Sequence, residues 1–166
     1  MRRRGSGNRA WAVLLAAAIL VAATTLVAAA AASLFDLAET GTAAQVQAAV
    51  KGANVNAVDD AGRTVLMHAA AYNSDPQVVA LLVSAGAKVN ARGPRQWTAL
   101  MMAAWGNPNP AVVDSLLAAG ANAKLRSDAG ETAYDYGADN DKLKGTPTYA
   151  RLRAAAGGKT AGAGER

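Results

Sequence analysis

Cysteine is absent from the sequence, and histidine occurs only once among its 166 residues. The absence of cysteine excludes disulfide bonds and thiolate chemistry, although it does not indicate a cellular compartment. The single histidine, His68, leaves little room for a metal site or a Ser-His-Asp arrangement, because both need a histidine with organised partners. We therefore expect no cofactor and no metal site.

An excess of charge of one sign is also missing from most of the chain. The net charge is +5, with 17 Lys and Arg against 12 Asp and Glu. Four of the cations precede residue 10, at Arg2, Arg3, Arg4 and Arg9. The rest of the chain has 13 cations against 12 anions. It therefore lacks the positive surface that nucleic-acid binding requires, and we expect no nucleic-acid partner.

The first 32 residues have the three parts of a secretory signal peptide: a basic start, an uncharged apolar stretch at residues 10–32, and small residues at its end. The alternative is an uncleaved anchor, because a stretch of this length can span a bilayer. Cleavage after Ala30-Ala31-Ala32 is favoured, since alanine adds little insertion energy. We expect an exported, periplasmic bacterial protein or, in the alternative, one anchored to the cytoplasmic membrane by residues 10–32.

The sequence repeats itself with a period of 34 residues. TVLMHAAAYNSDPQVVALLVSAGAKVNAR at residues 64–92 is nearly restated as TALMMAAWGNPNPAVVDSLLAAGANAKLR at residues 98–126. Threonine and glycine recur with the same spacing, at Thr64, Thr98 and Thr132 and at Gly52, Gly86 and Gly120. A fixed period of this length indicates a solenoid, in which each unit buries its apolar face only against its neighbours.

Each unit is expected to form a helix, a turn, a second helix and an extended loop. Thr64 can cap a first helix, whose apolar stripe at helical spacing consists of Leu66, Ala69 and Ala70. A capping residue followed by proline starts the second helix, at Asp75-Pro76 and at Asn109-Pro110. A glycine able to adopt the left-handed conformation ends it, at Gly86 and Gly120. Three methionines are expected to fill the core: Met67, Met101 and Met102.

These motifs resemble the ankyrin repeat. The resemblance covers about residues 34–155 and depends on the G-A-x-V-N-A endings, the D-x-x-G-x-T loop at residues 59–64 and the T-x-L-x-x-A-A helix starts. Three features depart from the family: the period exceeds the usual length of about 33 residues, His68 lies one place late, and the loop at residues 93–97 lacks both the aspartate and the glycine of the D-x-x-G-x-T motif. The resemblance implies an all-α ankyrin-repeat solenoid of about four helix-turn-helix units, joined by polar loops or hairpins.

The expected repeat domain extends over residues 33–156. Its units are expected at about residues 34–57, 58–91, 92–125 and 126–155, with the first and last acting as caps. Thr146-Pro147 repeats the pattern that starts a helix. Residues 157–166 have nothing to bury and are expected to be disordered.

Candidate catalytic groups are few. His68 is expected at the surface or partly packed, because no histidine or glutamate lies near it at a ligand spacing. Asp135 and Asp139 are four residues apart, and paired carboxylates can act as acid and base in glycoside cleavage. A solvated face of the last unit explains these aspartates more simply. The sequence predicts a protein that is not an enzyme, with a hydrolase using Asp135 and Asp139, with or without His68, as the less favoured alternative.

The resemblance implies a protein partner that binds a concave groove of loop tips and first helices. Residue types that dominate binding energy at interfaces occur at five expected groove positions: Arg63, Tyr72, Arg95, Trp97 and Trp105. Other expected groove residues are Asp60, Ala71, Glu131, Asp139 and Asn140. The alternative is that Trp97 and Trp105 only pack on each other or on the neighbouring loop.

The favoured function is therefore a non-catalytic, exported ankyrin-repeat protein that acts as an adaptor, an inhibitor or a protective partner. The sequence does not identify the protein that it binds. A membrane-tethered structural protein, held by an uncleaved residues 10–32 helix, is the second hypothesis.

Overall fold

The computed structural model describes residues 33–158, where eight α-helices and one short 3₁₀-helix are joined by turns and loops. The helices form four pairs: α2 (Leu34–Thr40) with α3 (Ala43–Ala49), α4 (Val65–Tyr72) with α5 (Pro76–Ser84), α6 (Ala99–Gly106) with α7 (Pro110–Ala118), and α8 (Ala133–Gly137) with α9 (Pro147–Ala155). The 3₁₀-helix η1 (Pro94–Gln96) lies in the loop before α6. The predicted all-α repeat solenoid is confirmed.

The predicted signal peptide or anchor at residues 1–32 lies outside the described residues, and so does most of the predicted disordered tail, at residues 159–166. The first two residues of that tail form the turn that follows α9, where Gly157 has a φ of 87° and the Gly158 N–H donates to the Arg153 carbonyl. Among residues 33–158, none of the helices has the length and hydropathy needed to span a bilayer.

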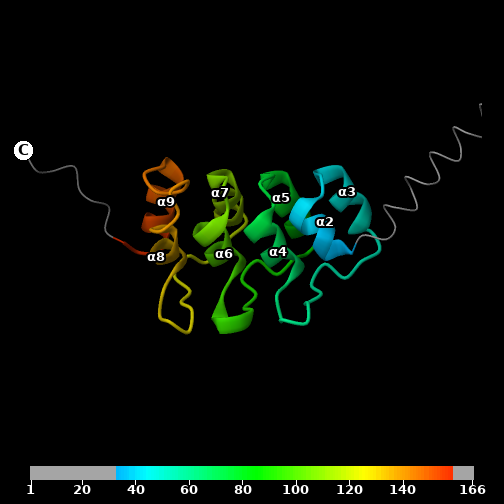
Figure 1. The fold of residues 1–166 in the computed structure, drawn as a ribbon, viewed down its shortest axis with the longest axis horizontal. Coiled ribbons are helices and arrows are strands. Elements are labelled where there is room, and N and C mark those ends of the chain that lie inside the picture. The colour runs from blue at the N-terminus through cyan, green and yellow to red at the C-terminus, as the bar shows by residue number, and fades with distance from the viewer. Residues whose placement is uncertain (1–32, 159–166) are drawn as a thin grey trace, which may run out of the picture. The chain divides into compact units, whose positions relative to one another are not determined.

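The helix pairs stack side by side in two rows (Figure 1). The first helices α2, α4, α6 and α8 contact one another in order, and the second helices α3, α5, α7 and α9 form the other row. The connecting loops project beyond the row of first helices (Figure 1). A backbone hydrogen bond closes each loop as a hairpin. The N–H groups of Asp59, Gly93 and Ser127 donate to the carbonyls of Arg63, Trp97 and Glu131, respectively.

The predicted helix boundaries have the expected caps. The Thr64 hydroxyl accepts from the Met67 backbone N–H at the start of α4. Asp75 and Asn109 cap α5 and α7, each followed by a proline at the first helical position. These caps satisfy N–H groups that have no partner within the helix.

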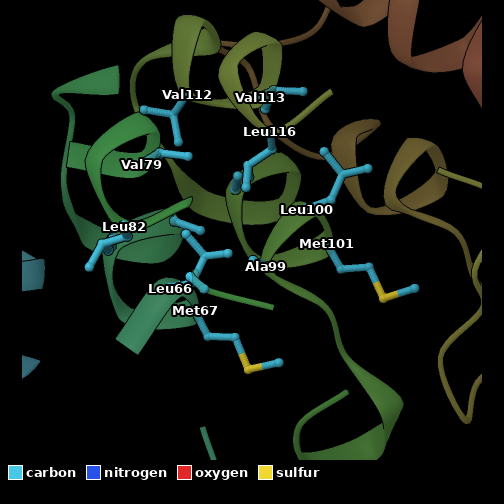
Figure 2. Packing of buried hydrophobic residues seen from close by; sticks show 14 of the residues in the cluster. Leu66, Met67, Val79, Leu82, Ala99, Leu100, Met101, Val112, Val113 and Leu116 are labelled. Atoms are coloured by element: carbon cyan, nitrogen blue, oxygen red, sulfur yellow. The ribbon is translucent and has the colours of Figure 1, made fainter. Parts of the chain in front are cut away.

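The core lies between the two rows and is continuous across the units (Figure 2). The first helices contribute fully buried alanines, which allow close approach, and larger side chains such as Leu66 and Leu100. The second helices contribute Val79, Leu82 and Leu116. The core assignment of Met67 and Met101 is confirmed. Met102 is half-buried and packs against this core from its edge.

A buried asparagine just after each of the last three first helices ties its unit to the preceding one. The Nδ2 of Asn107 donates to the carbonyls of Ala70 and Asn73, both at 2.9 Å, and its Oδ1 accepts from the Asn109 N–H. Asn73 and Asn140 make the equivalent bonds. The expectation that Asn140 faces the groove is therefore wrong, because its amide is buried between two units.

A second pair of asparagines links the loops at the surface. The Nδ2 of Asn90 donates to the Gly120 carbonyl at 3.1 Å, and its Oδ1 accepts from the Asn122 N–H at 2.7 Å. Asn56 makes the same two bonds one unit earlier. Water can replace these bonds because Asn90 is exposed.

We expect Asn107→Ala to lower the free energy of unfolding by about 3 kcal/mol, because it leaves buried carbonyls without donors. Asn90→Ala, the matched exposed substitution, should lower it by less than about 1 kcal/mol. Urea denaturation of both variants measures the difference. Equal losses would show that the buried bonds between units do not determine stability.

Candidate functional site

The structure brings four of the five predicted partner-binding residues around one cavity of about 300 Å³. The cavity lies between α4 and α6, beside the loop that leads into α6. Its lining consists of Arg63, Ala71, Tyr72, Trp97, Met102, Trp105 and Gly106. Arg95, the fifth predicted residue, is not part of the lining.

The cavity arises where two adjacent units depart from the repeat. Ala71 and Trp105 are repeat-equivalent, as are Tyr72 and Gly106, since each pair is separated by 34 residues. At these two positions one unit has alanine followed by tyrosine, and the next unit has tryptophan followed by glycine. Gly106 leaves room, because an added Cβ would meet no atom within 4 Å.

Three of the seven residues that line the cavity are aromatic. Trp97 and Trp105 are in edge-to-face contact, with ring centroids 5.9 Å apart. Trp97 also packs on Tyr136 at 4.4 Å and is half-buried. Packing against neighbouring rings is therefore enough to explain why an aromatic residue occupies position 97. Packing does not explain the aromatic residues at positions 105 and 72, because Trp105 and Tyr72 remain 60% and 57% exposed.

Arg63 is the charged member of the lining and is held by Asp59. Its Nε and Nη2 both lie 2.8 Å from the Asp59 Oδ2, and its backbone N–H donates to Oδ1 at 2.7 Å. Burial of this carboxylate opposes ionisation, but hydrogen bonds from the Arg63 backbone, His68 and the Arg63 side chain outweigh it and lower the Asp59 pKa from 3.8 to about 2. The hydrogen bond to Asp59 in turn raises the Arg63 pKa.

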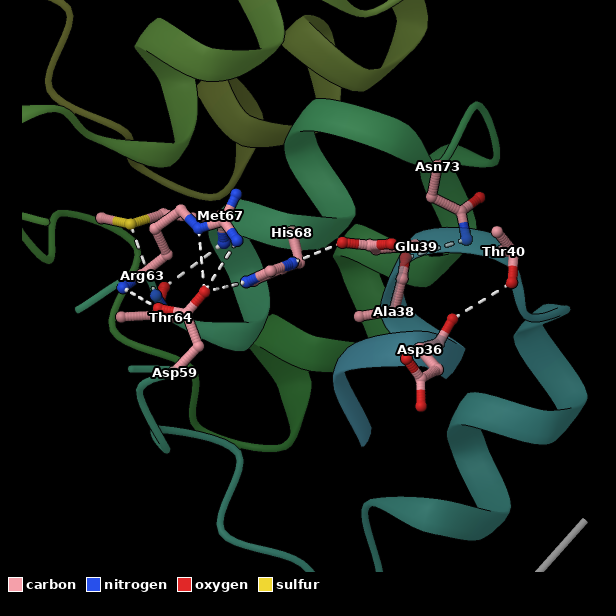
Figure 3. A network of polar contacts seen from close by, with 10 residues as sticks. All are labelled: Asp36, Ala38, Glu39, Thr40, Asp59, Arg63, Thr64, Met67, His68 and Asn73. Carbon is pink, nitrogen blue, oxygen red and sulfur yellow. Dashed lines mark hydrogen bonds and ion pairs between the residues drawn. The ribbon is translucent and has the colours of Figure 1, made fainter. Parts of the chain in front are cut away.

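His68 extends this network away from the cavity (Figure 3). Its Nδ1 lies 2.6 Å from the Glu39 Oε1, and its Nε2 lies 2.9 Å from the Asp59 Oδ2. Both nitrogens can donate at once only in the imidazolium form. The expectation of a surface or partly packed histidine is wrong, because His68 is only 5% exposed. Its repeat equivalents are Met102 and Tyr136, which are both partly buried. The large side chains at these equivalent positions are the sequence signal that could have predicted the burial of His68.

The structure places His68 and Asp135, two of the residues of the alternative hydrolase, on helices that are not neighbours. The Asp135 Oδ2 accepts from the backbone N–H and the hydroxyl of Thr132, both at 2.8 Å. The backbone bond is the largest of the causes that lower the Asp135 pKa, so this carboxylate caps α8 in its ionised form. His68 is on α4, and α6 separates α4 from α8 (Figure 1). Across residues 33–158, no group of three or more acidic or histidine side chains could hold a metal ion.

Arg95 lies in the loop that lacks the repeat's aspartate and glycine. Its φ is 54°, and that of Gln96 is 59°. Gly62 and Gly130 occupy the position of Gln96 in the neighbouring loops, both with a φ of 79°. The Arg95 carbonyl accepts from the Asp128 N–H of the next loop at 3.0 Å. The loop therefore keeps the hairpin conformation although Gln96 replaces the glycine of the repeat, and two L-residues occupy a disfavoured region.

We expect Gln96→Gly to raise the free energy of unfolding by roughly 1 kcal/mol, because glycine adopts this conformation without a Cβ clash. The reciprocal Gly130→Gln should lower it by a similar amount. Thermal denaturation of both variants tests this. A destabilised Gln96→Gly variant would mean that side-chain contacts of Gln96, such as its bond with Arg92, outweigh the backbone strain.

The lowered Asp59 pKa predicts a specific loss of stability in acid. Because this pKa is about 2 in the folded chain against 3.8 ordinarily, ionised Asp59 contributes fully above about pH 4, and the contribution disappears as the pH falls towards 2. Asp59→Asn should be less stable at pH 6 and should lose less stability between pH 4 and pH 2. Urea denaturation across this range measures both, with exposed Asp60→Asn as the control. Parallel pH profiles for wild type and Asp59→Asn would refute the assignment.

Comparison with known proteins agrees with the architecture. A family model of ankyrin repeats in three copies matches residues 27–127, which is more than half of the chain. No curated protein matches the chain at a significant level. Ankyrin repeats are generally protein–protein interaction modules, and the family is generally non-enzymatic. The chain belongs to the ankyrin-repeat family.

Proposed function

We propose that this protein is an exported adaptor, inhibitor or protective partner that binds another protein through its first helices and loops, and that it has no catalytic activity of its own. The single observation that carries this proposal is the cavity between α4 and α6. Two of the residues that line it, Tyr72 and Trp105, are among the exposed large hydrophobic side chains of the described residues. Exposed aromatics grouped with an arginine are typical of interaction sites.

The repeat itself does not require these aromatic side chains. The equivalent positions in the neighbouring unit are Ala71 and Gly106, and both units fold in the same way. The caps, the buried asparagines and the alanine-rich first helices account for the scaffold. Tyr72 and Trp105 are therefore available for binding, because neither the core nor the helix ends depend on them.

The basic start and apolar stretch of residues 1–32 support export. The alternative is that residues 10–32 remain attached and tether the domain to the cytoplasmic membrane. The two forms differ in intact mass, since cleavage leaves a chain that begins near Ser33.

We expect the double variant Tyr72→Ala, Trp105→Ala to retain its fold, because both side chains are exposed. It should capture much less of the partner protein than the wild type does. The measurement is a cross-linked pull-down from the exported fraction of the native cell, followed by direct binding of the identified protein. Affinity should fall at least about tenfold.

The control is Val58→Ala, which removes an exposed large hydrophobic side chain (59% exposed) that does not line the cavity. It should capture the same protein as the wild type. Equal capture by the double variant would place binding on another face.

A further inference from the structure

The size of the cavity limits what it can hold. Its volume of about 300 Å³ is at the lower end of the range for small-molecule sites, which begins at about 300 Å³. It has room for one large side chain of a partner, and it is too small for a folded element. The contact is therefore an anchor for a single residue.

The walls favour an aromatic anchor. Trp97 and Trp105 already form an edge-to-face pair, and aromatic rings add to such arrangements with a preferred geometry that aliphatic side chains lack. Tyr72 faces the cavity from the other unit, and Met102 supplies a thioether that makes favourable contacts with aromatic rings.

The charge of the lining selects against a cation. Arg63 is its charged member, and no carboxylate is part of it. Asp59 pairs with Arg63 and so offsets part of its positive charge, but the Asp59 oxygens are directed to Arg63 and His68, and no oxygen of Asp59 is left to attract a cation into the cavity. A guanidinium has five N–H donors, and Asp59 takes up Nε and one N–H of Nη2. The Tyr72 hydroxyl also interacts with this guanidinium, and the remaining donors are available to an acceptor on the ligand.

We propose that this cavity binds one uncharged aromatic side chain of the partner protein, with a carbonyl or carboxylate oxygen next to that side chain meeting Arg63. This inference rests on the proposed function and specifies the chemistry of the partner. Gly106 and Ala71 are specificity determinants, because the space that they leave between Tyr72 and Trp105 admits the ring.

Gly106 offers a direct test. A larger side chain there enters open space and lies in a helix, where replacing glycine is favourable for folding. Gly106→Leu should therefore fill the cavity without unfolding the protein. Gly52→Leu is the matched control, since an added Cβ at Gly52 also meets nothing within 4 Å and Gly52 does not line the cavity.

The experiment is an NMR titration of the full-length ¹⁵N-labelled chain, with the indole N–H signals of Trp97 and Trp105 assigned by single Phe substitutions. The probes are a capped Gly-Phe-Asp-Gly peptide, the same peptide with Leu or Ala in place of Phe, and tetramethylammonium chloride. We expect the Phe peptide to shift both indole signals saturably. The Leu and Ala peptides should bind at least about tenfold more weakly.

In the Gly106→Leu variant, the affinity for the Phe peptide should fall at least about tenfold, while Gly52→Leu binds as the wild type does. If Gly106→Leu does not fold, Trp105→Ala is the second variant, with the same expected loss. Equal binding of the Leu peptide, tighter binding of tetramethylammonium, no shift with any probe, or full binding by the filled variant would each overturn the inference.

Failure of this inference is distinguishable from failure of the proposed function. If a protein is captured through Tyr72 and Trp105 but the Phe peptide does not bind, the interaction surface stands and the aromatic anchor is wrong. If the Phe peptide binds and no protein is captured, the cavity chemistry stands and the proposed protein partner is wrong.

Discussion

The structure depends on hydrogen bonds from buried asparagine amides that join each unit to the one before it. A unit of two short helices cannot bury its apolar face alone, so its neighbour must supply the other half of the core. The amide of Asn107 fixes the spacing of two first helices by bonding to two carbonyls of the preceding unit. Because that spacing is fixed, residues 71–72 and 105–106 must face each other, and the cavity between them follows from the side chains at those positions.

A chain of polar contacts connects the first unit to this cavity. Glu39 on α2 bonds to His68 on α4, His68 bonds to Asp59, and Asp59 holds the guanidinium of Arg63 at the cavity wall (Figure 3). The members come from two units and one loop, and Arg63 has little freedom because Asp59 also bonds to its backbone. The capping unit therefore does more than cover the end of the core, since it also helps to position a side chain of the candidate site.

The repeat period predicted the fold, because a threonine or a proline at a fixed spacing specifies a helix start wherever it recurs. The same period does not specify what lies across the interface between units. For this reason the sequence alone predicts exposed positions for His68 and Asn140, whereas their hydrogen-bond partners, such as Glu39 and Ala104, lie 29 and 36 residues away in the sequence. The aromatic residues of the cavity were predictable from their types. The hollow beside them was not, since it depends on Gly106 facing Tyr72 across two units.

We propose that the scaffold is generic and that the break in its repeat between α4 and α6 carries the binding function. Hydroxyl-radical footprinting of the complex with the captured partner tests this claim most directly, because it reports the solvent exposure of individual aromatic side chains. We expect Tyr72 and Trp105 to become protected on binding, while Tyr134 and Tyr149, which stack on each other between α8 and α9, keep their reactivity. Protection of Tyr134 and Tyr149 with no change at Tyr72 and Trp105 would contradict it.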